Sequence, residues 1–155
     1  MPLSGIFLGL GQDTTKQLLR SVSVGRLKTY QIFDRVKTRL HTPKLNQEAL
    51  LKLGPRVWTR LNDHEEDLAL DLAQAILVSH LDLIVAVLDF LEIPHTDGFF
   101  EKETDIAARL ADGWQQRVLD QFQDRFPNAL LLFYVNHLAH EVDENAPLFV
   151  PGGSA

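Results

Sequence analysis

Hydrophobic residues recur at three- and four-residue steps along most of the chain, which is the spacing of one face of an α-helix. Residues 26–40 carry such a stripe at Leu27, Tyr30, Phe33, Val36 and Leu40. Shorter amphipathic stretches occupy residues 13–22, 46–53 and 55–61, the last two separated at Gly54-Pro55. No stretch alternates between apolar and polar residues for long enough to predict a β-strand. The pattern therefore predicts an all-α protein.

The most apolar segment, residues 68–91, belongs to a longer stretch, about 64–92, that contains no helix-breaking residue. On a helical wheel one mostly acidic sector holds Asp67, Asp71, Gln74, Val78, Asp82, Val85, Asp89 and Glu92, two of which are valines. The rest of the circumference is almost entirely apolar, as in a helix that other helices surround. Asp63 and Glu66 have the spacing of a capping box, and Pro94 would end the helix. We predict one continuous central helix over about 64–92, roughly 43 Å long at 1.5 Å per residue.

Two further helices are expected in the C-terminal half. Residues 101–126 repeat an apolar residue every four positions, and residues 128–142 follow Pro127. Gly113 would lie in mid-helix, where glycine costs about 1 kcal/mol relative to alanine, and we attribute it to a close helix contact. Short links favour antiparallel neighbours. We therefore predict a single domain, 1–155, folded as a bundle of five to six helices, with residues 1–11 and 145–155 as loosely ordered tails, the first of them either docked on the body or disordered.

Composition removes several classes of chemistry. The 155 residues are 45% hydrophobic and 23% charged, which is normal for a globular domain. The absence of cysteine excludes disulfides, thiolate metal sites and cysteine nucleophiles. The apolar N-terminus lacks the basic residues of a signal peptide, and the acidic residues within 64–92 oppose a membrane span. We expect a soluble, cytoplasmic protein without a membrane segment.

Charge is distributed unevenly along the chain. Residues 1–62 hold 11 Lys/Arg and 3 Asp/Glu, whereas residues 63–155 hold 4 and 18. Either the two parts neutralise each other within the molecule, or the basic segment 16–60 binds an anion or nucleic acid. Residues 46–61 have a loose helix-turn-helix outline that would support the second reading. Its candidate anion-binding residues are Arg35, Arg39, Arg56 and Arg60.

A metal site is the second chemical hypothesis. His80 lies on the apolar side of the expected central helix, and His137, His140 and Glu141 follow one another at helical spacing on the last helix. If the last helix runs alongside the central one, these four side chains would meet in mid-bundle, where imidazoles and a carboxylate suit a divalent metal. No motif for an organic cofactor or a nucleotide occurs.

No catalytic constellation can be named from these residues. The leading hypothesis is a non-enzymatic helical interaction or regulatory protein, with a protein partner or self-association, for example as a homodimer. The alternatives are a metal-binding or metal-dependent enzyme around His80, and an anion- or nucleic-acid-binding regulator that uses the basic segment.

Overall fold

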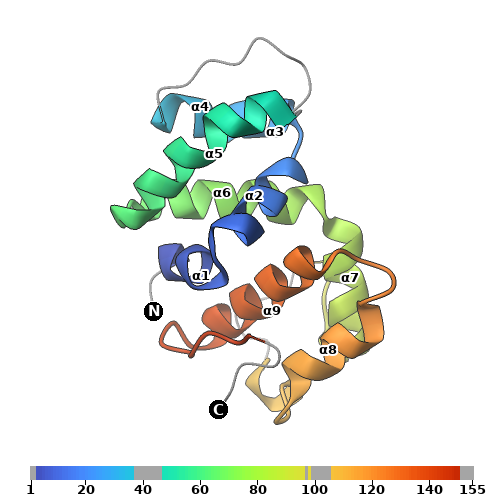
Figure 1. Ribbon diagram of the computed structural model, residues 1–155. Helices are drawn as coiled ribbons and strands as arrows, with labels where there is room; N and C mark the ends of the chain where they lie inside the picture. The colour runs from blue at the N-terminus through green and yellow to red at the C-terminus, as the bar shows by residue number, and fades with distance from the viewer. Residues whose placement is uncertain (1–2, 37–46, 97, 99–105, 151–155) are drawn as a thin grey trace. The chain divides into compact units, whose positions relative to one another are not determined.

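The structure is a computed structural model that describes residues 3–36, 47–96, 98 and 106–150 (Figure 1). Over these ranges the chain forms α-helices and one short 3-10 helix, with no β-strand. The all-α prediction is therefore confirmed. The chain divides into two compact units, Met1–Ser79 and His80–Ala155.

The first unit is built around helix α6. Its helices are α1 (Leu3–Leu10), α2 (Gln12–Arg20), α3 (Val24–Thr29), α4 (Ile32–Arg35), α5 (Gln47–Asn62) and α6 (Glu66–Ser79). Helices α1, α3, α4 and α5 all contact α6. The buried side chains of α6 are Leu68, Ala69, Leu72, Ala73, Ala75 and Ile76. The N-terminal half of the predicted central helix is thus the centre of this unit.

The N-terminal segment, expected as a loosely ordered tail, forms helix α1, and the side chains of Ile6 and Phe7 are completely buried. Gly11 adopts a φ of +99°, which glycine tolerates and which lets the chain turn between α1 and α2. The Thr15 hydroxyl on α2 donates to the backbone oxygens of Gly11 and Phe7, at 3.0 and 3.3 Å. These bonds join the two helices at the turn.

Two sequence-based boundaries in the first unit were wrong. Helix α5 continues through Pro55, so the helix-turn-helix outline does not exist. Proline cannot donate a bond to the carbonyl of Leu51, but Leu51 is 63% exposed, so this part of the helix faces water. The expected helix 26–40 is also interrupted, because Gln31 has a left-handed φ of 62° between α3 and α4.

The predicted continuous helix over 64–92 was wrong as well. Helix α6 ends at Ser79, α7 (Leu81–Phe90) begins two residues later, and His80 between them is not helical, with φ −134° and ψ 45°. The Ser79 hydroxyl donates to the carbonyl of Ala75 at 2.7 Å, a local bond that competes with regular helix geometry. Neither glycine nor proline marks the break, so periodicity alone could not locate it.

The expected capping box is not formed, because Asp63 belongs to the end of α5. Its amide donates to the carbonyl of Thr59, and the next residue, His64, has a φ of 58°. The His64 amide donates a hydrogen bond to the carbonyl of Leu61, and the Glu65 amide donates one to the carbonyl of Arg60. This pair of bonds is a Schellman motif that ends α5 before α6 begins at Glu66.

The described part of the second unit contains α7, a 3-10 turn (Ala107–Arg109), α8 (Trp114–Phe122) and α9 (Asn128–Val142). Within the described residues 106–126 the expected helix is limited to α8, and residues 101–105 lie outside the described ranges. Gly113 is the N-cap of α8 with a φ of +81°, and a Cβ built there would meet nothing within 4 Å. The close contact inferred for this glycine was wrong, since backbone conformation explains it.

Helix α9 is the most completely buried helix of the chain's described part. Ten consecutive residues, 129–138, are buried, including the polar residues Asn136 and His137. The Asn136 amide nitrogen donates to the backbone oxygens of Leu132 and Phe149, and its oxygen accepts the amide proton of Phe149 at 2.8 Å. These bonds fix the chain near Phe149, within the segment expected to be loose; residues 151–155 lie outside the described ranges.

No single helix in the described ranges has the length and apolar character needed to cross a membrane; only α6 and α7 taken together, across the break at His80, satisfy both conditions.

Candidate functional site

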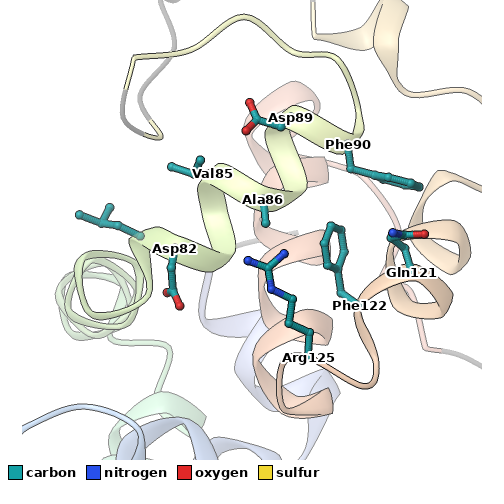
Figure 2. A pocket seen from close by; sticks show the side chains of 9 residues that line it. Asp82, Val85, Ala86, Asp89, Phe90, Gln121, Phe122 and Arg125 are labelled. Carbon is teal, nitrogen blue, oxygen red and sulfur yellow. The ribbon is translucent and has the colours of Figure 1, made fainter.

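An open groove of about 750 Å³ lies in the second unit, between α7 and the C-terminal end of α8 (Figure 2). Helix α7 contributes six residues, and α8 with the turn after it contributes three. The lining residues are Leu81, Asp82, Val85, Ala86, Asp89, Phe90, Gln121, Phe122 and Arg125. A concave, partly apolar surface with a few polar groups is typical of a binding site.

The groove exists because α7 is apolar on more than one face. Leu83, Ile84, Val87 and Leu88 form its buried side. On the other side Val85 and Ala86 are half-buried, while Leu81 and Phe90 remain 38% and 37% exposed. These residues supply the apolar surface that a ligand in the groove would cover.

Two aromatic rings join the walls of the groove. Phe90 of α7 and Phe122 of α8 meet edge to face, with centroids 5.6 Å apart and planes at 80°. Figure 2 shows these rings side by side, with the Arg125 side chain extending toward Ala86. The Arg125 guanidinium also lies 5.1 Å from the centre of the Phe126 ring, a cation–π contact that holds it in place.

The α7 wall is acidic. Asp82 and Asp89 lie seven residues apart on the same face, and both are exposed. Asp89 Oδ1 is 2.7 Å from Nε2 of His95, whose Nδ1 accepts the Gly98 amide proton at 3.0 Å. Because Nδ1 is an acceptor, the ring proton is on Nε2, and a neutral His95 donates to Asp89. Both carboxylates therefore keep oxygens directed to solvent.

Three of the four predicted metal ligands belong to α9. His137 Nδ1 lies 3.5 Å from Glu141 Oε1, which confirms that these two side chains share a face. Burial lowers the pKa of His137 from 6.5 to about 4, and the nearby His140 acts in the same direction. Burial raises the pKa of the Glu141 carboxyl. The contact is therefore not an ion pair at neutral pH, because His137 is uncharged there.

His80, the fourth predicted ligand, is the half-buried N-cap residue of α7. Among residues with described positions, no three His, Asp or Glu side chains form a group that could hold a metal ion. His80 and the α9 residues therefore do not form such a group, and a metal site that uses them stays a prediction. Tyr134 lies one turn before His137 on α9, and burial together with the Glu141 charge raises its pKa.

Three of the four predicted anion-binding arginines make contacts within the first unit. Arg35 Nε binds Asp71 at 2.6 Å, Arg60 binds Glu65 at 2.9 Å, and Arg56 donates to the carbonyl of Val36 at 3.4 Å. Arg39 lies outside the described ranges. These contacts favour the reading in which opposite charges of the chain neutralise each other locally.

The sequence contained one signal for the groove that was not followed. Val85 falls within the acidic sector of the helical wheel, and it is one of the two apolar residues there. The other lining residues could not be assembled, because Gln121 and Arg125 reach α7 only through the packing of α8.

Comparisons of this chain with protein-family models, with curated proteins and with solved structures found no match. The arrangement of its own side chains is therefore the basis for a functional conclusion.

Proposed function

We propose that this protein is a non-enzymatic interaction or regulatory protein that binds a segment of another protein in the α7–α8 groove. The observation that carries the proposal is the open groove itself, with Leu81 and Phe90 more than a third exposed along it. Aromatic residues and arginine are enriched in protein interfaces, and the groove contains Phe90, Phe122 and Arg125. The groove is also large enough for several partner side chains.

The chemical content of the groove supports binding rather than catalysis. Its titratable groups are Asp82, Asp89 and Arg125, all exposed. Among the described residues, Tyr134 and His137 have strongly shifted pKa values, and both are buried on α9 and do not line the groove. A general acid or base must instead reach the substrate and have a pKa matched to its task.

A selection experiment tests the proposal. The full-length protein is immobilised, and an unbiased display library of short peptides is selected for binding. Selected peptides should lose most of their affinity for Ala86→Arg, because a long charged side chain would fill the groove without disturbing the helix. Gln116→Arg is the matched control, since it adds the same charge on the exposed face of α8 outside the groove.

Peptides that bind wild type, Ala86→Arg and Gln116→Arg equally would contradict the proposal. Helical circular dichroism of all three proteins must be the same for the comparison to count.

A further inference from the structure

We propose that the groove receives an amphipathic α-helix of a partner protein, and that the edge of this helix facing α7 is cationic. This inference rests on the proposed function and names the chemistry of the partner. It depends on the shape of the groove, on the backbone groups around it and on the charges of its two walls.

The shape suits a helix of about three turns. Asp82, Val85, Ala86 and Asp89 follow the spacing i, i+3, i+4 and i+7, so they form one stripe along α7. The ten residues of α7 extend over about 15 Å. Side chains on such a stripe form ridges and grooves into which a second helix packs.

The backbone groups around the groove also favour a helix. Both walls are largely helical, so most of their backbone N–H and C=O groups are bonded within α7 and α8. An extended peptide in the groove would find few backbone partners, and its own buried amides would stay unpaired. A helical occupant satisfies its backbone internally and presents only side chains to Val85, Ala86 and Phe90.

The charges of the two walls specify which edge of the partner helix faces α7. Asp82 and Asp89 are about 10 Å apart along the α7 axis, given seven residues at 1.5 Å each. Two Lys or Arg residues seven positions apart on the partner would face them in register. Residues 80–155 hold 13 Asp/Glu and 4 Lys/Arg, so the sequence around the groove also attracts a cationic ligand. Arg125 on the opposite side disfavours a second cationic edge there.

Three synthetic peptides of about 14 residues test this inference. They share one leucine and alanine face and differ only at two edge positions seven residues apart, which carry Lys, Gln or Glu. Fluorescence anisotropy should show the Lys peptide binding about tenfold more tightly than the Glu peptide at low salt, with the Gln peptide between them. The preference should shrink as ionic strength rises.

Two isosteric double variants assign the effect to the groove. Asp82→Asn with Asp89→Asn removes the two carboxylates and retains an oxygen for the His95 bond, and it should abolish the preference for Lys. Asp112→Asn with Asp143→Asn makes the same change of net charge at exposed positions outside the groove, and it should leave the preference intact.

Several results would overturn the inference. If all three peptides bind equally and Ala86→Arg still blocks them, the charge assignment fails although the groove remains a binding site. If none binds while selected peptides of other character do, the occupant is not a cationic helix. If light scattering shows a dimer that Ala86→Arg dissociates, a second copy occupies the groove.

Discussion

Helices α7 and α9 belong to the same unit and are both rich in apolar residues, yet their surroundings differ. Residues 129–138 of α9 are all buried, and its polar side chain Asn136 is bonded to backbone. Helix α7 buries one side and leaves Leu81, Asp82, Asp89 and Phe90 exposed. An apolar sequence therefore does not by itself indicate burial, and the surplus apolar surface of α7 is what the groove consists of.

Similar apolar residues should have different roles in these two helices. Apolar side chains between residues 129 and 138 of α9 should contribute to the stability of the fold, because neighbouring atoms surround them almost completely. Those on the open side of α7 should contribute little to stability and more to binding.

The largest effect is expected from matched leucine truncations. Leu131→Ala on α9 removes a fully buried side chain and should lower the free energy of unfolding by about 2–5 kcal/mol. Leu81→Ala on α7 should lower it by less than about 1 kcal/mol, because the site is partly open to water. Urea denaturation of both variants measures the difference. Equal losses would show that the groove side of α7 is packed after all.

A pH dependence is expected from His137 on α9. Its pKa is about 4 in the folded protein and 6.5 in the unfolded chain, so between these values the unfolded chain binds more protons. The contribution of His137 to the free energy of unfolding is therefore fully present above pH 6.5. It decreases by about 3 kcal/mol as the pH falls toward 4. Denaturation at a series of pH values across this window measures the decline.

Glu141 acts in the opposite direction, because its raised pKa means that the folded protein takes up a proton before the unfolded chain does. His137→Gln should flatten the decline, whereas Glu141→Gln should steepen it. A decline that persists unchanged in His137→Gln would assign it to other groups.

The two helices also show what the sequence could and could not predict. The spacing of apolar residues predicted α9 well, because Pro127 marks its start and its periodicity is unbroken. The same reasoning joined α6 and α7, because nothing in the sequence around His80 distinguishes a break from a continuing helix. Likewise, Pro55 suggested a break where α5 continues, since the loss of one hydrogen bond on a solvent-facing side is tolerated.

Candidate sites were harder to predict than helices because they depend on which elements meet. Helical spacing was sufficient to place His137 next to Glu141 on one helix. Pairing Phe90 with Phe122 required knowing that α7 packs beside α8. Left-handed residues such as His64 and Glu92 were also missed, because glycine usually occupies those positions.

The bonds that Asn136 makes to the chain after α9 should contribute less to the free energy of unfolding than Leu131 or His137. Asn136→Ala removes three hydrogen bonds, two of them to the backbone of Phe149, and should lower the free energy of unfolding by about 2 kcal/mol. Limited proteolysis should then cleave near Phe149 faster than in wild type. Gln121→Ala, at an exposed position in the groove, is the control and should leave the cleavage rate unchanged.

The smallest change in the free energy of unfolding is expected at the C-terminal end of α7. Glu92 closes this helix in a Schellman motif, with a φ of 59° and amide bonds from Glu92 to Asp89 and from Ile93 to Leu88. A side chain in this conformation costs about 1 kcal/mol, which glycine avoids. Glu92→Gly should therefore raise the free energy of unfolding by up to about 1 kcal/mol, while Glu92→Ala should not raise it. Because the change leaves the groove residues in place, peptide affinity should stay constant, and a loss of affinity in Glu92→Gly would show that the end of α7 is itself part of the binding surface.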